Sequence, residues 1–344
     1  MPPAKSTQHA NRGLGRWVGA CIAVLILLII VFGSVRHSPP ESSQQPIYPP
    51  ERREAPLTVE QSVSLTVPDN VRTETHSFYV QAGRSYLLSF TVSTVKPRGT
   101  PGTAMYLGIS LGCTGGGDRE VRSVSGTQNI LDDEPVRLSN QFLMTATQSG
   151  QRSCNVQVSS PNESAAAVGA TVDVDVKWEQ TPVGEDAQAL AAGDRLPAVV
   201  QAGERRAAFR GTIDIANARN KELWLISTLH LTTCTIVNGS REGGEPMCIE
   251  SEIDSEGSSV DVDLRANVLD ENGGRCDSLE VFEDSLHIDR KTHHQLLSLS
   301  RKEHLPAELC GETLEFVLAV DNGGPAPLVV HGGSSSFIFV LEDS

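Results

Sequence analysis

Four oxygen-bearing side chains in an acidic stretch have the chemistry of a site for a hard cation. Residues 242–289 contain 15 acidic and 2 basic side chains, and Ca²⁺ prefers carboxylate and amide oxygens as ligands. The candidate ligands are Asp261, Asp263, Asp270 and Asn272. The stretch lacks the register of an EF-hand, which needs a glycine at position six and a glutamate at position twelve. Because Asp261-Val262-Asp263 also fits a strand with one solvated face, the pattern favours an acidic surface over a calcium site.

Two other motifs could do chemistry, and neither fits the context that its chemistry requires. Gly108–Gly112 matches the nucleophile-elbow pattern G-x-S-x-G, but the glycine-rich Cys113–Gly117 that follows cannot begin the helix that an elbow needs. Ser110 is therefore predicted to be an outward-facing strand residue. The histidines at positions 287, 293, 294 and 304 lack zinc-ligand spacing, because adjacent histidines on a strand point to opposite faces. We predict exposed histidines, no metal or cofactor, and no enzyme. A pocket of buried carboxylates or histidines would reverse that expectation.

The cysteines predict structural disulfides. Six of the seven lie beyond residue 100, and none forms a Cys-x-x-Cys pair of the kind that binds zinc or exchanges disulfides. We expect Cys113 to pair with Cys154. Two connectivities stay open for the other four. An internal repeat implies Cys234 with Cys310 and Cys248 with Cys276, whereas pairing between sequence neighbours gives Cys234 with Cys248 and Cys276 with Cys310.

An apolar segment near the N-terminus places these residues outside the cell. Trp17 to Val35 contains no charged side chain, and as a helix it would be about 28 Å long, close to the hydrocarbon thickness of a bilayer. Lys5, Arg12 and Arg16 precede it without any acidic residue, which predicts a cytoplasmic N-terminus. We expect an uncleaved, single-pass signal anchor in the plasma membrane. A cleaved signal peptide is the alternative, although the apolar run is longer than such peptides use.

The charge distribution restricts the class of partner. Residues 1–180 carry 15 acidic and 15 basic side chains, whereas residues 181–344 carry 28 acidic and 13 basic. The whole net charge of −15 therefore belongs to the second half. Such a half repels nucleic acid and anionic membrane surfaces. We expect no nucleic-acid partner and a protein partner with a basic surface.

Beyond the anchor, short runs rich in Val, Thr, Ser and Tyr alternate with turn residues, which predicts strands and little helix. The fold class is mostly β, with two tandem, disulfide-containing antiparallel β-sandwiches of jelly-roll or immunoglobulin-like type. The expected parts are a cytoplasmic tail (1–16), the anchor (17–35), a proline-rich spacer (36–56), a first sandwich (57–180), a linker with one or two helical turns (181–195) and a second sandwich (196–344).

The second sandwich is predicted to repeat the first. Val-Gln-Ala-Gly occurs at 80–83 and at 200–203, and MYLGISLGC at 105–113 then matches LWLISTLHLTTC at 223–234. This alignment leaves about 33 extra residues in the second copy, so the acidic stretch 242–289 is predicted to be an insertion. Loops added to a repeated scaffold are common positions for function.

We therefore predict a non-enzymatic, membrane-anchored envelope or surface protein whose tandem sandwiches contact another protein. Two alternatives remain. A carbohydrate- or cell-wall-binding module would need exposed aromatic side chains along one sheet face, and a calcium-dependent adhesion protein would need the oxygen ligands named above. Trp178 and Trp224 fall in predicted strands, which favours core positions over sugar platforms.

Overall fold

The computed structural model describes residues 56–94, 105–115, 118–130, 136–160, 169, 171–184, 187–190, 195–216, 218, 221–235, 241–242 and 245–342. The predicted tail, the anchor at Trp17 to Val35 and the spacer up to residue 55 lie outside these residues. Within the described ranges, no helix is both long and apolar enough to cross a membrane. The anchor therefore stays a prediction from the sequence.

Antiparallel strands make up nearly all of the regular structure that is described. In chain order they are β1 (Leu57–Thr66), β2 (Asn70–Arg72), β3 (His76–Val80), β4 (Ser85–Thr94), β5 (Met105–Gly115), β6 (Asp118–Ile130), β7 (Arg137–Thr145), β8 (Gly150–Ser159), β9 (Thr171–Val183), β10 (Gln188–Leu190), β11 (Ala198–Val200), β12 (Arg205–Asp214), β13 (Glu222–Thr233), β14 (Arg241–Glu242), β15 (Glu245–Pro246), β16 (Ser258–Leu269), β17 (Arg275–Ile288), β18 (His294–His304), β19 (Thr313–Asn322), β20 (Leu328–Val330) and β21 (Ser336–Glu342). A short 3-10 helix, η2, spans Glu250–Glu252. The mostly β, antiparallel fold class agrees with the prediction.

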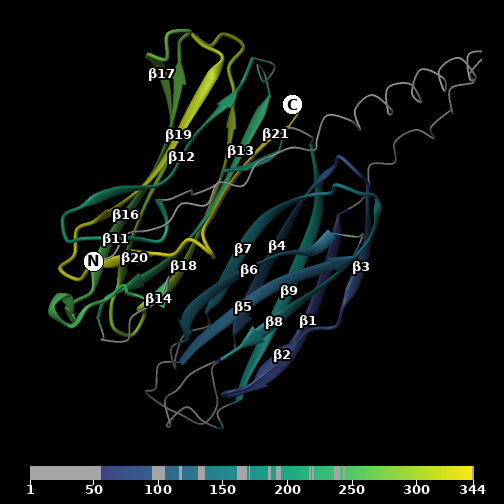
Figure 1. Ribbon diagram of the computed structural model, residues 1–344, viewed down its shortest axis with the longest axis vertical. Helices are drawn as coiled ribbons and strands as arrows, with labels where there is room; N and C mark the ends of the chain where they lie inside the picture. The colour runs from purple at the N-terminus through teal and green to yellow at the C-terminus, as the bar shows by residue number, and fades with distance from the viewer. Residues whose placement is uncertain are drawn as a thin grey trace, which may run out of the picture. The chain divides into compact units, whose positions relative to one another are not determined.

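The first sandwich packs two sheets against each other (Figure 1). Sheet A has the strand order β1-β9-β4-β7, and sheet B has the order β2-β8-β5-β6, with β3 also paired to β8. Side chains alternate along each strand: in β9 the even-numbered residues from Val172 to Trp178 are buried, whereas Asp173 and Asp175 are exposed. The buried faces of both sheets form one hydrophobic core.

The second sandwich is formed by sheets C and D. Sheet C has the order β10-β21-β13-β20-β11, and β18 also pairs with β13. Sheet D has the order β12-β19-β16-β17. In β16 the even-numbered residues from Val260 to Val268 are buried, and they join Phe316, Phe337 and Phe339 in the core between the two sheets.

The strand order of the second sandwich repeats that of the first, but with a different alignment from the predicted one. The path β10-β21-β13-β18 corresponds to β1-β9-β4-β7, and β12-β19-β16-β17 corresponds to β3-β8-β5-β6. The predicted alignment matched 105–113 in β5 with 223–234 in β13, whereas the counterpart of β5 is β16. The acidic stretch 242–289 is therefore not an inserted loop, because it supplies β16 and β17.

The tetrapeptide that suggested this alignment specifies a turn rather than a position in the fold. Gly83 and Gly203 have φ angles of 82° and 73°. In both copies the amide after the glycine donates to the glutamine carbonyl, at 3.1 and 2.9 Å. Glycine with positive φ at the third residue fits a type II turn. The first turn joins β3 to β4 and the second joins β11 to β12, which are not equivalent connections.

Three disulfides are present in the described chain. Cys113 bonds to Cys154, as predicted, and joins the neighbouring strands β5 and β8. The other two pairs are Cys234–Cys248 and Cys276–Cys310. The pairing that the repeat implied, Cys234 with Cys310 and Cys248 with Cys276, is wrong because the repeat alignment behind it is shifted by one strand.

The predicted linker at 181–195 belongs partly to the sheets. β9 continues to Val183, and β10 pairs with β21 in sheet C. The helical turns expected between 185 and 192 are contradicted at residues 188–190, which form this strand.

Sheets A and C pack against each other at a surface that we call the junction, within one compact unit that begins at residue 54. Its apolar part comprises Leu87, Val183, Ala187, Ile226, Ile338 and Val340, with Leu143 and Trp224 partly buried. Leu296 of β18 packs into the core of the first sandwich. Ser298 Oγ also donates to the carbonyl of Ser139 in β7, at 2.5 Å. The two sandwiches are therefore joined by side-chain contacts as well as by the chain.

Candidate functional site

The outer face of sheet D is acidic because of the register of its strands. In β16 the even-numbered residues face the core, so the odd-numbered residues, including Asp261 and Asp263, project outward. The residues opposite them on the neighbouring strands share this face. β19 contributes Asp321, and β17 contributes Glu283. Acidic residues that are far apart in the sequence thus meet on one surface.

Carboxylates stand directly opposite one another across these strands. Asp261 is paired with Asp321 in the register of β16 with β19, and Asp263 is paired with Glu283 in the register of β16 with β17. Opposed side chains in an antiparallel sheet have Cβ atoms about 5 Å apart, and like charges at that distance destabilise the sheet. The face therefore concentrates negative charge at a cost in stability.

Only part of this charge is neutralised by basic side chains. Asp263 is 7% exposed and forms ion pairs with Arg205 and with Arg265, the latter at 2.9 Å. Among the described side chains, none forms an ion pair with Asp261, Glu283 or Asp321. These three carboxylates remain available to an external cation.

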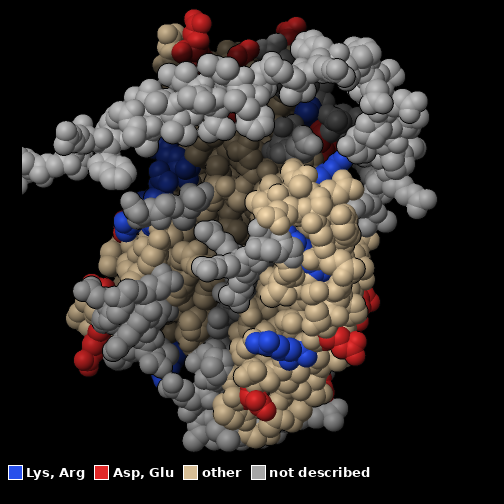
Figure 2. Space-filling view, turned by 45° about the vertical axis from the view of Figure 1, so that its right-hand side comes forward, with Lys and Arg blue, Asp and Glu red and all other residues tan. Residues whose placement is uncertain are grey.

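The carboxylates line a groove of about 440 Å³ that we call the carboxylate groove. Its lining residues are Arg205, Asp261, Val262, Asp263, Glu283, Asp284, Ser285 and Asp321. A second groove of about 470 Å³ shares Asp263 and Glu283 with it and continues along β16 and β17 past Arg265 and Arg275. Figure 2 shows one face of the molecule, on which uncharged residues predominate and charged side chains are scattered. Most of the carboxylates in this groove belong to the acidic stretch 242–289, and cross-strand pairing with β19 adds Asp321.

The four calcium candidates are not brought together. Asp263 and Asp270 are seven residues apart along one extended segment, which places them about 23 Å apart. Asp270 Oδ1 accepts hydrogen bonds from the amides of Asn272 and Gly274 in the β16–β17 turn, at 2.9 and 2.8 Å. Within the described residues, no group of three or more His, Cys, Asp or Glu side chains is placed to hold a metal ion.

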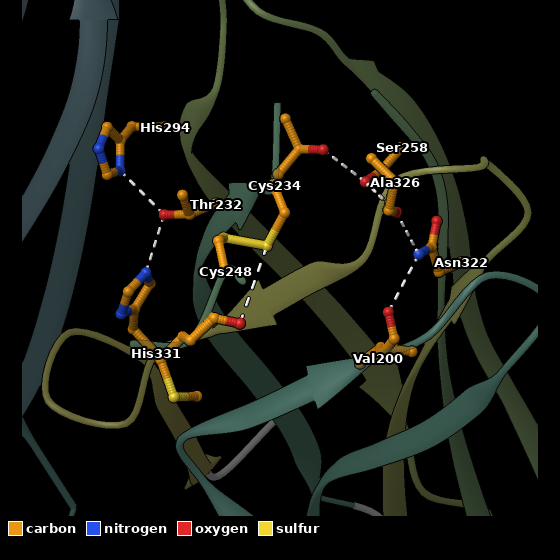
Figure 3. Close-up of a disulfide and its surroundings, with 11 residues drawn as sticks. Val200, Thr232, Cys234, Cys248, Ser258, His294, Asn322, Ala326 and His331 are labelled. Atoms are coloured by element: carbon orange, nitrogen blue, oxygen red, sulfur yellow. Dashed lines mark hydrogen bonds between the residues drawn. A yellow bond between two sulfur atoms is a disulfide. The ribbon is translucent and has the colours of Figure 1, made fainter. Parts of the chain in front are cut away.

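A second cluster of titratable groups lies beside the junction, with His230 and His331 buried and His294 half-buried. The ring of His230 in β13 stacks on that of His331 at a centroid distance of 4.3 Å and lies 5.8 Å from that of His294 in β18. Thr232 Oγ1 is hydrogen-bonded to His294 Nδ1 at 2.9 Å and to His331 Nε2 at 2.8 Å (Figure 3). His230 Nδ1 is hydrogen-bonded to Ser334 Oγ at 2.7 Å. We call His230, His294 and His331 the histidine cluster.

Burial favours the neutral form of His230, His293 and His294. Removal from water, reinforced by the neighbouring His331 and His294, holds the pKa of His230 well below its usual value. Burial together with the nearby His293 and His331 lowers the pKa of His294 to about 3. Burial also lowers the pKa of His293, although a backbone hydrogen bond with Arg290 opposes the shift. The prediction of exposed histidines is therefore wrong for His293 and His294, and holds for the exposed His287 and His304.

The remaining residues singled out from the sequence occupy structural positions. Ser110 lies on the outer face of β5, between the buried Ile109 and Leu111. Trp178 is 1% exposed in the core of the first sandwich. Trp224 lies at the junction, where its Nε1 donates to Ser300 Oγ at 2.8 Å and the Lys302 ammonium stands 5.0 Å above its ring. Neither tryptophan forms an open platform for a sugar ring.

Comparison with known proteins gives no family. No family model matches the sequence, and no curated protein matches it. Among solved structures, the tandem CBM22 domain of Xyn10C from Paenibacillus barcinonensis is 13% identical with a TM-score of 0.26, over 77% of this chain and 82% of that one. Peptide:N-glycanase F is 12% identical with a TM-score of 0.34, over 82% and 96%. The VP2 protein of infectious bursal disease virus is 11% identical with a TM-score of 0.30, over 86% and 72%. At such values these likenesses carry no information on function.

Proposed function

We propose that this chain is a non-enzymatic, membrane-anchored extracytoplasmic protein whose sheet D binds a basic segment of another protein. The observation that carries the proposal is that two pairs of opposed carboxylates, Asp261–Asp321 and Asp263–Glu283, line one groove. Among the described side chains, the ion pairs on this face are those of Asp263 with Arg205 and Arg265, and they neutralise part of the charge. A lysine or arginine side chain from a partner would reduce the repulsion that remains between these carboxylates. The repulsion destabilises the free protein, so its removal would favour binding.

The location follows from the disulfides and the apolar segment together. Three disulfides favour an oxidising compartment. The uncharged Trp17 to Val35 supports an anchor with the sandwiches on the far side of the plasma membrane. The proposed partner is therefore an extracytoplasmic protein.

The alternatives find less support in the described residues. Tyr79 is the one aromatic side chain there that is mostly exposed, at 54%, so no aromatic row marks a sugar-binding face. The buried histidine cluster could suggest catalysis, since it pairs imidazoles with hydroxyls. However, His230, Thr232 and Ser334 are each at most 8% exposed, and neither groove described above is lined by them.

The proposal is tested by measuring peptide binding to the full chain in nanodiscs of zwitterionic lipid. The probes are a lysine-rich peptide and a glutamate-rich peptide of the same length, labelled for fluorescence anisotropy. The test variant is Asp261→Asn with Asp321→Asn. The matched control is Asp173→Asn with Asp175→Asn, which removes the same charge from the exposed face of β9.

We expect the lysine-rich peptide to bind the natural chain and the β9 control alike, and to bind the sheet D variant at least about 10-fold more weakly, which corresponds to the loss of one or two charge-assisted contacts. Binding should also weaken as salt is added. Equal weakening in both variants would show that net charge alone is responsible. Failure of the natural chain to bind the lysine-rich peptide would remove the basic partner.

A further inference from the structure

The face of β13 that meets the first sandwich changes from apolar to titratable along its length. Leu223, Leu225, Leu229 and Leu231 turn into the core of the second sandwich. The even-numbered residues turn the other way. Trp224 and Ile226 belong to the apolar part of the junction, and His230 and Thr232 continue the same face. The histidine cluster is therefore the polar continuation of the junction.

The histidine cluster is bonded to residues that hold the two sandwiches together. Ser334, whose hydroxyl is bonded to His230, accepts a hydrogen bond on its carbonyl from Asn140 Nδ2 of β7, at 3.3 Å. His294 lies on β18 two residues before Leu296, which packs into the core of the first sandwich. Each of these two histidines is therefore linked, through Ser334 or through two positions of β18, to a residue that contacts the first sandwich.

Among the described residues, the titratable groups that act on the ring of His230 are His331 and His294. β13 bears its only acidic residue, Glu222, at the opposite end, and residues 331–336 contain no charged side chain apart from His331. β7 contributes Asn140, and its one charged residue, Arg137, is exposed. On β18 the charged residues lie at 301–303, away from His294, and β6 carries its four within 118–122. The carboxylate before β18, Asp289, is hydrogen-bonded to Lys291 and Thr292. No described carboxylate stands ready to stabilise an imidazolium.

The geometry also leaves one ring nitrogen without compensation. His230 Nε2 is buried and has no hydrogen-bond partner among the described residues. A neutral imidazole tolerates this when Nε2 is the unprotonated nitrogen. An imidazolium would place a second buried N–H there without an acceptor, beside two further rings within 5.8 Å.

We propose that the histidine cluster is an acid-sensitive latch: at neutral pH it holds the two sandwiches together at the junction, and protonation of His230 and His294 opens that junction. The lowered pKa values of His230 and His294 support this direction. A histidine whose pKa is depressed in the closed form stabilises that form fully above the pKa of about 6.5 that it has when exposed, and this stabilisation is lost as the pH falls. The latch is independent of the peptide-binding face on sheet D.

Amide hydrogen exchange of the full chain in nanodiscs, followed by mass spectrometry from pH 7.5 to 4.5, tests the latch. After correction for the intrinsic rate of each amide, the opening constant rises about 10-fold per pH unit for each histidine that is protonated on opening. With His230 and His294 both titrating, we expect about 100-fold per unit below pH 6 for amides of β7 and β18. Each of these strands pairs with one described neighbour and is covered by the other sandwich only while the junction is closed. Amides of β16 and β19, in the core of the second sandwich, should keep their protection.

The variant His294→Gln, which can still hydrogen-bond to Thr232, should reduce this dependence to about 10-fold per pH unit. The matched control His304→Gln, at an exposed position of the same strand, should leave it at about 100-fold. Equal dependence in the two variants would overturn the proposal. The natural chain provides a test that does not depend on folding of a variant. If acid raises exchange in β16 and β19 as much as in β7 and β18, the protein unfolds as a whole and no latch exists.

Discussion

Replacing Asp261 by asparagine should stabilise the protein, which is unusual for a substitution at a polar surface residue. Asp261 is exposed on β16 and is paired directly with Asp321 on β19. No basic side chain forms an ion pair with either of them in the described part of the chain. Asparagine has nearly the same shape as aspartate, so the substitution removes one of two opposed negative charges and little else.

The magnitude follows from the register. With opposed Cβ atoms about 5 Å apart, the two carboxylates lie at roughly 6 Å, where the repulsion is about 0.7 kcal/mol at the dielectric constant of water and about 1.4 kcal/mol at half that value. Arg205 lies opposite Asp321 in the register of β12 with β19, and its positive charge weakens the repulsion between Asp261 and Asp321. Its ion pair, however, is made with Asp263. We therefore expect a gain of about 0.5 to 1 kcal/mol at low salt.

Urea unfolding of the full chain in detergent, followed by tryptophan fluorescence, measures this gain. The matched control is Asp175→Asn on β9, because Asp175 is paired with the uncharged Ser62 and accepts its hydroxyl at 2.6 Å. This control should show no gain. At 0.5 M salt, where charges are screened within about 4 Å, the gain from Asp261→Asn should shrink. A loss of stability in Asp261→Asn, or a gain that salt leaves unchanged, would refute the reasoning.

Three further predictions concern stability. Replacing Cys276 and Cys310 by alanine removes a disulfide with a sequence separation of 34. The free energy of unfolding should fall by about 4 kcal/mol in the chain-entropy model, which is measured as a lowered urea midpoint. An unchanged midpoint would contradict this expectation. Ile226→Ala, at a junction residue that is 1% exposed, should cost about 2 to 4 kcal/mol, and amide exchange should rise first in the strands β7 and β18 at the junction. Equal rises throughout both cores would argue against a separate junction. Gly257→Ala should lower the free energy of unfolding by at least about 2 kcal/mol, because φ is +83° and a Cβ would lie 2.0 Å from the carbonyl oxygen of Ile288. Gly273→Ala is the milder control, because Gly273 has a similar φ but no atom near the position of the added Cβ.

Strand content and fold class were predictable because alternation is a local signal. In β9 the sequence VDVDVKW shows its buried and exposed faces directly, and the structure buries every second residue. The same rule placed Ser110 on an outer face. Such predictions need only the two-residue period of a strand and no knowledge of which strands are neighbours.

Equivalence between the two sandwiches was not predictable from the shared tetrapeptide. Val-Gln-Ala-Gly encodes a type II turn through its glycine, and that turn serves two different connections. Matching β5 with β13 leads to the wrong pairs Cys234–Cys310 and Cys248–Cys276 and to an insertion that is not present. Cross-strand pairing decides equivalence, and no pairing can be derived from one sequence alone.

The histidine cluster was missed because its members come from three segments, at 230, 294 and 331. One signal was present. The run LWLISTLHLTT is apolar or hydroxylated on both faces of the strand, which is typical of a strand that is covered on both sides. It predicts that His230 is buried and that a second layer lies against sheet C, but it cannot identify the residues that cover it.

The structure also decides how the acidic stretch should be tested. Deleting residues 242–289 would remove β16, which pairs with β17 and β19 and carries part of the core. A chain without it would lose the second sandwich, and loss of a partner would then say nothing about charge. Single substitutions on the outer face leave the buried residues of β16 in place.

Site-specific photocrosslinking in native membranes tests the central claim most directly. A photoreactive amino acid at Ser285, which lines the carboxylate groove, is compared with the same group at Ser62, which lies on β1 in the first sandwich. We predict a crosslinked protein from position 285 whose yield falls when Asp261→Asn and Asp321→Asn are added, and no such product from position 62. Equal products from both positions, or a yield at 285 that is indifferent to the two carboxylates, would contradict a basic partner bound on sheet D.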